Sequence, residues 1–232
     1  MCGRYVNKNT IEDIIGFFGS EIKFDESHSL KPSYNICPTQ LAMTLRGQSN
    51  GMRLDSMNWG LIPSWSKDKK YASNLINARL ETINDKPSYK GLVKNYRCIV
   101  IASGYYEWVK TENGKEPMYI YSNQSVLPLA GLWTSWGNMN SFTIITQSSF
   151  GDLRKLHHRM PLILDNSSIF SYLDEGVDFD SSFQILSDSL SYHRVCLLYT
   201  SPSPRDKRQS RVAASAVKKK WGGGGGGGGG GG

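Results

Sequence analysis

The fold of this 232-residue chain is decided by the stretch CIVIASGYYEWVKTENGKEPMYIY, residues 98–121. Its first five residues form an apolar run of the length expected for a buried strand. Residues 105–110 and 118–121 then flank Asn113-Gly114, a turn dipeptide typical of β-hairpins. A buried strand that leads directly into a hairpin predicts antiparallel sheet in the middle of the chain.

The same pattern continues on both sides of this stretch. Residues 41–46 and 52–59 flank Asn50-Gly51 and predict a second hairpin. Further strands are expected downstream, over residues 127–132, 142–146 and 162–164.

Few segments have the period of a helix. Residues 10–18 carry apolar side chains on one helical face, and Thr10 with Asp13 resembles a capping box. A second helix is expected to begin after Asp165 or Asn166. Because strands dominate and do not alternate with helices, the sequence predicts one α+β domain with a curled, barrel-like, mostly antiparallel sheet and a few peripheral helices.

The net charge of +7 is unevenly distributed along the chain. Residues 196–232 contribute +6, from seven Lys and Arg against the single acid Asp206, so residues 1–195 carry only +1. A role in nucleic-acid binding therefore depends on where individual basic residues lie, and not on the overall isoelectric point.

The C-terminal segment, residues 196–232, has no apolar period and ends in eleven consecutive glycines. It is either a natural disordered basic arm or a non-native end joined to a shortened gene, and a terminal glycine run favours the second interpretation. We expect the functional domain to span residues 1–195, with its final strand cut short.

Composition excludes several classes of protein. No apolar run is long enough to span a membrane, and the N-terminus lacks the pattern of a secretory signal. The four cysteines are scattered, without zinc-ligand spacing, which indicates an intracellular protein with no metal. No organic cofactor is expected either, and the chain is expected to be a monomer.

The first residues, Met1-Cys2-Gly3-Arg4, indicate unusual chemistry. If Met1 is removed, Cys2 carries a free α-amine beside its thiol. The amine condenses with an aldehyde to an imine, and the thiol closes on the imine carbon to give a thiazolidine. The amine has a reference pKa near 8 and the thiol one of about 8.5, so reactive forms of both exist near neutrality.

Several further motifs accompany this N-terminus. In chain order they are MCGRY (1–5), YNICP (34–38), WGLIPSW (59–65), INARLET (76–82), GYYEW (104–108) and HHRMP (157–161). As an ordered set they closely resemble the SRAP family of abasic-site processing proteins, over about residues 1–195. The resemblance implies a curled, barrel-like α+β domain that senses an abasic site in single-stranded DNA and crosslinks to it through Cys2.

The resemblance also assigns catalytic roles. It matches Cys2, Asn77, Glu107 and His157 to the family's catalytic residues. Glu107 and His157 would transfer protons during sugar opening and imine formation. Asn77 would hydrogen-bond the sugar or hold the amine of Cys2.

The residues expected to bind DNA lie near these motifs. Three of them are arginines, which suit phosphates that flank the lesion. The other two, a proline and a tryptophan, would stack on or wedge between bases. They are Arg4, Pro38, Trp65, Arg79 and Arg159.

Other interpretations of the same residues stay open. Cys2, His157 and Asn77 also fit a thiol peptidase that acts in trans, and the basic residues fit a reader of single-stranded DNA that forms no covalent bond. The family resemblance further implies removal of Met1 by self-processing, a lyase side activity through the imine, and a link to the SOS response. We expect the protein in the cytoplasm or nucleoid of a bacterium, or in the nucleus of a eukaryote.

Overall fold

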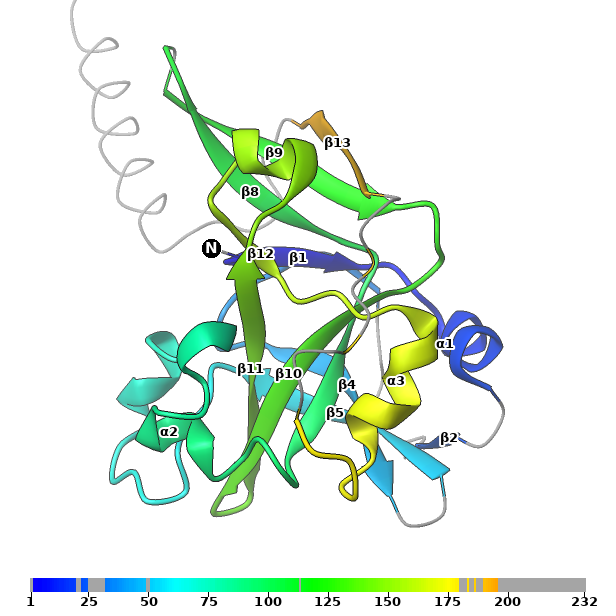
Figure 1. The fold of residues 1–232 in the computed structure, drawn as a ribbon, viewed down its shortest axis with the longest axis vertical. Coiled ribbons are helices and arrows are strands. Elements are labelled where there is room, and N and C mark those ends of the chain that lie inside the picture. The colour runs from blue at the N-terminus through cyan, green and yellow to red at the C-terminus, as the bar shows by residue number, and fades with distance from the viewer. Residues whose placement is uncertain are drawn as a thin grey trace, which may run out of the picture. The chain divides into compact units, whose positions relative to one another are not determined.

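A computed structural model describes residues 2–19, 22–24, 32–48, 51–112, 114–179, 183, 186 and 190–195. The C-terminal segment 196–232 lies outside this part of the chain, as do Asn50 and Asn113 of the two predicted turns. Figure 1 shows long, curved strands at the centre and short helices at the periphery.

The larger sheet closes on itself. Its strand order is β12-β11-β10-β7-β4-β5-β2, and a parallel pairing of Ser141 and Phe142 with Asn58 and Trp59 joins β11 back to β5. A ring of strands with this closure is a small barrel. The strands of the ring are β4 (Leu41–Gln48), β5 (Gly51–Trp59), β7 (Arg97–Ala102), β10 (Leu127–Trp136) and β11 (Met139–Ser148). The predicted curled, mostly antiparallel sheet is confirmed.

Three short strands extend this sheet. Strand β2 (Ile22–Phe24) pairs with β5, whereas β6 (Asn77–Arg79) and β12 (Arg159–Pro161) both pair with the end of β11. The strand predicted over residues 162–164 is wrong, because regular pairing ends at Pro161 and only an isolated bridge joins Ile163 to Leu129.

A smaller sheet stands against the barrel. Its order is β13-β9-β8-β1-β3, and the β8–β9 hairpin rises well above the barrel in Figure 1. The strands are β1 (Arg4–Asn7), β3 (Ser33–Ile36), β8 (Gly104–Thr111), β9 (Gly114–Ser122) and β13 (Leu190–Arg194). Strand β7 leads into β8 through Ser103, so one stretch of chain serves both sheets, whereas the sequence predicts a single curled sheet.

The helices begin where the sequence predicts. Helix α1 (Ile11–Phe18) has the full capping box of Thr10 and Asp13, and Asp165 caps α3 (Asn166–Leu173). The remaining helices are α2 (Pro87–Lys90) and the 3₁₀ turns η1 (Lys69–Ser73), η2 (Leu80–Thr82) and η3 (Gly151–Lys155). In the described part of the chain, none of them has the length and apolar character that a membrane crossing requires.

The core fixes the chain where it leaves the barrel. Trp59 is fully buried and makes an edge-to-face contact with Tyr5 of β1, with ring centroids 5.2 Å apart. Gly60 follows at φ +120°, and a Cβ there would collide with the carbonyl oxygen of Ala72. This tight passage directs residues 61–76 across the barrel end toward β6.

Candidate active site

Pairing of β1 with β8 brings the N-terminus beside Glu107. The antiparallel register sets Arg4 opposite Tyr106 and Tyr5 opposite Tyr105, so Cys2 lies alongside the next part of β8. The side chain of Cys2 is fully buried, and Glu107 is only 5% exposed. Two strands far apart in sequence thereby place a thiol and a carboxyl group in one enclosed space.

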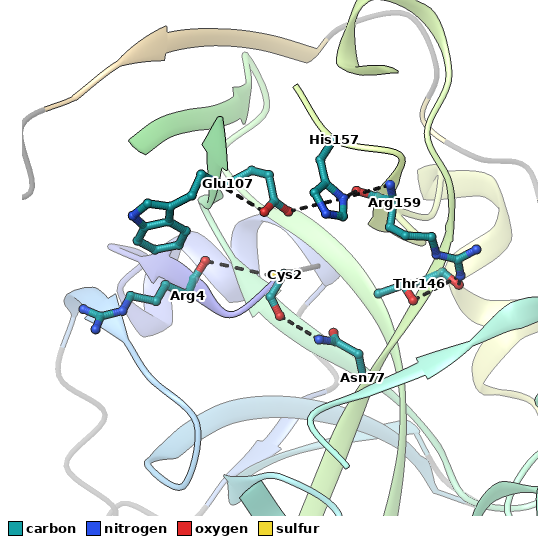
Figure 2. Close-up of polar contacts among 8 residues, drawn as sticks. Cys2, Arg4, Asn77, Glu107, Thr146, His157 and Arg159 are labelled. Atoms are coloured by element: carbon teal, nitrogen blue, oxygen red, sulfur yellow. Dashed lines mark hydrogen bonds and ion pairs between the residues drawn. The ribbon is translucent and has the colours of Figure 1, made fainter. Parts of the chain in front are cut away.

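The end of β11 brings the other two predicted residues to the same place. Thr146 of β11 is opposite Arg79 of β6 and also opposite Pro161 of β12, so these two strands flank β11 on its two edges. Asn77 begins β6, and His157 lies just before β12. Figure 2 shows Cys2, Asn77, Glu107 and His157 gathered from separate elements.

The thiol of Cys2 is held in its neutral form. Burial raises the pKa of this thiol, and the nearby charge of Glu107 raises it further. The thiol, a weak donor, donates a long hydrogen bond of 4.0 Å from Sγ to the carbonyl oxygen of Arg4. A reaction of this thiol as a nucleophile therefore needs a base close by, and Glu107 is such a group.

Asn77 anchors Cys2 through the main chain. Its Nδ2 donates a hydrogen bond of 2.8 Å to the carbonyl oxygen of Cys2 (Figure 2). Its Oδ1 is buried and has no hydrogen-bond partner among the described residues. From the sequence we expect this amide to hydrogen-bond the sugar or hold the amine of Cys2. In the structure Nδ2 binds the carbonyl oxygen of Cys2 instead, and Oδ1 can still accept a hydrogen bond from the sugar or from the amine.

His157 is oriented by the backbone of Arg159, the first residue of β12. The N–H of Arg159 donates to its Nδ1 at 2.9 Å, and the same nitrogen lies 3.9 Å from Oε2 of Glu107. From this N–H donor at Nδ1 we assign the proton of the neutral ring to Nε2. The carbonyl oxygen of Arg159 also lies 3.1 Å from Nδ1 and would accept a hydrogen bond from the opposite tautomer. The exposed ring of His158 stacks on His157 with centroids 4.3 Å apart, and the charge of His157 lowers the pKa of His158. His157 can therefore offer a proton from Nε2 while Glu107 lies on its other side.

The predicted DNA-binding residues differ in their surroundings. Trp65 is 58% exposed, Arg79 is exposed, and Pro38 is half-buried in a turn whose next residue, Thr39, has φ 72°. A β-branched residue at positive φ is uncommon and is typical of strained functional loops. Arg4 donates to Oδ1 of Asn35 at 3.1 Å.

Arg159 is the exception within this set, because its side chain is only 9% exposed. Its guanidinium binds the carboxylate of Glu81 and the carbonyl oxygen of Thr146. The sequence argument does not single out Glu81, although it lies in the quoted motif INARLET. A carboxylate two residues after Arg79 is the one signal that could have suggested an internal partner for an arginine.

Comparisons with known proteins show the family of the chain. The family model described as SOS response associated peptidase (SRAP) matches residues 1–196. The chain belongs to the SRAP family. The abasic site processing protein YoqW of Bacillus subtilis is 34% identical over 214 residues, which cover 87% of this chain and 95% of YoqW. The abasic site processing protein HMCES of Xenopus tropicalis is 31% identical over 212 residues and is covered to 63%.

Solved structures show the same SRAP fold. A crystal structure from Bacteroides thetaiotaomicron has a TM-score of 0.73 at 23% identity, and the match covers 88% of this chain and 97% of that one. A second, from Bordetella bronchiseptica, has a TM-score of 0.70 at 22% identity, with coverage of 84% and 100%. At these identities the likeness concerns the fold.

Among the described residues of this SRAP protein, no group of three or more His, Cys, Asp or Glu side chains is arranged to hold a metal ion. The predicted chemistry of an α-amine and a thiol needs none. The site instead brings a buried thiol, a buried carboxyl group, a partly exposed imidazole and an amide close together (Figure 2).

Proposed function

We propose that this chain is an abasic-site processing protein that captures the lesion covalently through Cys2 after removal of Met1. The observation that carries the proposal is the burial of Cys2 against Glu107 and Asn77, with His157 on the other side of Glu107. The names of the curated relatives, among them YoqW, support the choice of substrate.

The chemistry begins at the ring-opened sugar, whose C1′ is an aldehyde. The α-amine of Cys2 attacks C1′, and the resulting carbinolamine loses water to give an imine. Protonation of the ring oxygen by Nε2 of His157 assists sugar opening, and the carboxylate of Glu107 accepts protons that the amine and thiol release. The thiol then adds across the imine, so a sulfur–carbon bond forms and nitrogen takes the proton. One water is lost overall.

The raised pKa of the Cys2 thiol fits this order of steps. A neutral thiol leaves the amine to act first, and its proton is needed on nitrogen when the ring closes. The buried, unpartnered Oδ1 of Asn77 supports a role in accepting a hydrogen bond from the amine or from the sugar.

The DNA strand is proposed to contact four of the predicted binding residues, of which Arg79 and Trp65 are exposed and Arg4 and Pro38 are half-buried. Arg79 and Arg4 would bind the flanking phosphates, and Trp65 and Pro38 would contact bases, which tolerates any sequence. Arg159 is less available than Arg79 to bind a phosphate, because Glu81 already binds its guanidinium.

The test is incubation with a single-stranded oligonucleotide that contains one abasic site, followed by a denaturing gel and intact-mass measurement. The wild-type protein is expected to lack Met1 and to give a shifted band on abasic DNA only. Cys37→Ala is a matched control, because Cys37 is a half-buried free thiol elsewhere in the chain; it should retain the band.

Cys2→Ala decides between the candidate functions. It keeps an α-amine, so it should lose the stable adduct, cleave the strand by β-elimination and be trapped as an imine by borohydride. A stable band that persists in Cys2→Ala contradicts the proposed nucleophile. Reversible, salt-sensitive binding without any adduct would identify a non-covalent reader, and turnover of peptides would identify a peptidase.

A further inference from the structure

An ion pair between the buried Arg159 and the exposed Glu81 lies directly beside the site. Oε1 of Glu81 and Nη1 of Arg159 are 2.5 Å apart, and Nη2 of Arg159 donates to the carbonyl oxygen of Thr146 at 2.5 Å and to its Oγ1 at 3.2 Å. Figure 2 shows the guanidinium reaching Thr146 on β11. The pKa of the Glu81 carboxyl is lowered mainly by its hydrogen bond to Arg159, so the pair stays charged near neutrality.

The position of this pair in the fold is unusual. Arg159 begins β12, which pairs with one edge of β11, while Glu81 lies in η2 directly after β6, on the other edge. The guanidinium therefore crosses β11 and joins the two flanking segments. One of these segments carries Asn77 and the other follows His157.

The same arginine holds the imidazole through its backbone. The N–H of Arg159 donates to Nδ1 of His157 at 2.9 Å, so the position of Arg159 determines where that ring lies. A guanidinium in a nearly dry environment is costly without its counter-charge. Loss of Glu81 would leave the guanidinium with Thr146 alone, so Arg159 and the hydrogen bond from its N–H to His157 would be held less firmly.

From these contacts we propose that Glu81 is a positioning residue, which acts through Arg159 to fix the tautomer and place of His157 relative to Asn77. The inference rests on the proposed function, in which His157 delivers a proton from Nε2. It also gives the Glu in INARLET a role distinct from that of Arg79, two residues earlier and exposed.

The test compares Glu81→Ala and Glu81→Gln with Glu116→Ala. Glu116 forms a 3.1 Å ion pair with Arg194 at the edge of the small sheet, so its loss controls for the removal of any ion pair. Glu81→Ala is expected to slow capture of abasic DNA on the order of 10-fold to 100-fold, because small displacements of catalytic groups have effects of this size. Glu81→Gln keeps an acceptor for Arg159 and should lose less, and Glu116→Ala should match the wild type.

The second measurement needs no DNA. Nitrogen-15 spectra of the histidine rings, assigned with His157→Gln, report the tautomer of His157 and its titration beside Glu107, His158 and Arg159. In the wild type, the neutral ring of His157 should carry its proton on Nε2. In Glu81→Ala, the spectra should show a mixture of the two tautomers. If Glu81→Ala does not fold, the same spectra are recorded on Glu81→Gln.

The outcomes separate the two proposals. An unchanged His157 spectrum in both Glu81 variants overturns the positioning role, even if DNA affinity falls. A changed spectrum in a protein that never captures abasic DNA supports the positioning role and contradicts the proposed function. Equal loss in Glu81→Ala and Glu116→Ala also overturns the inference, since it indicates a general effect on stability.

Discussion

Cys2 and Cys98 are both buried, but their surroundings differ. Burial raises the pKa of both the Cys2 thiol and the Cys98 thiol, and neither side chain is exposed. Cys98 lies on β7 within the barrel, packed so close to Gly131 that a Cβ on that glycine would lie 3.1 Å from its sulfur. Cys2 lies where the small sheet meets the barrel, beside Glu107 and Asn77.

The comparison teaches that burial by itself does not mark a reactive thiol. A cysteine buried in apolar packing is usually inert, and around Cys98 such packing outweighs the charge of Arg46. Around Cys2, the residues before β1, the start of β6 and the middle of β8 come together, and they contribute the polar groups of Asn77 and Glu107. Four predictions test this difference, in order of decreasing effect.

The strongest test moves the amine away from the thiol of Cys2. Insertion of one alanine between Met1 and Cys2 keeps the thiol but places the free amine one residue earlier. Covalent capture of abasic DNA should fall at least about 1,000-fold, because the two reacting groups no longer sit on one residue. Cys98→Ala should capture at the wild-type rate. Capture by the extended chain, measured on a denaturing gel, would remove the proposed role of the N-terminus.

Loss of the carboxyl group beside Cys2 should have the next largest effect. Glu107→Gln keeps the size of the side chain and removes its ability to accept a proton. We expect the rate constant for capture to fall about 100-fold, as for the loss of other general bases, with little change in DNA affinity. Single-turnover kinetics at saturating DNA measure this rate. An equal loss in affinity would show that Glu107 acts on binding.

Arg79 should change binding and leave the chemistry intact. Arg79→Ala is expected to weaken binding of single-stranded DNA by a similar factor whatever its sequence, and to reduce the slope of log affinity against log salt by about 1. Fluorescence anisotropy over a salt series gives both numbers. Arg53→Ala, on β5 beside Asp55, serves as a control remote from the site. An unchanged salt slope would exclude a phosphate contact of Arg79.

The smallest effect concerns stability at high pH. Since the pKa values of Cys2 and Cys98 are raised in the folded protein, their protonated thiols contribute stability that is complete below the unfolded pKa of about 8.5 and is lost as pH rises. The free energy of unfolding should fall above that pH by up to about 1.4 kcal/mol per pH unit for each thiol. Calorimetry should show a shallower decline for Cys98→Ala, and an unaltered decline would contradict the burial of this thiol.

Local patterns are sufficient to predict much of the fold. The capping box of Thr10 and Asp13 and the two hairpins around Gly51 and Gly114 depend on neighbours in sequence, so they can be read directly. Strands β6 and β12 could not be predicted this way. Each has three residues and is a strand only because the end of β11 supplies a partner.

The four predicted catalytic residues came from motifs and a family resemblance, and the structure gathers all four. It adds contacts that no motif contains. The Nδ2 of Asn77 binds the backbone of Cys2, and Arg159, predicted to bind phosphate, is buried against Glu81. Both contacts join residues more than seventy positions apart, which spacing along the chain does not reveal.

The sequence by itself determined the family, the class of fold and the residue types available for chemistry, because these depend on composition, short periods and ordered motifs. The tertiary structure decided which thiol has polar neighbours, which arginine stays exposed and which is buried, and how His157 is oriented. The physical reason is that burial and hydrogen bonding are properties of the environment, and here strands from both sheets create that environment at one point.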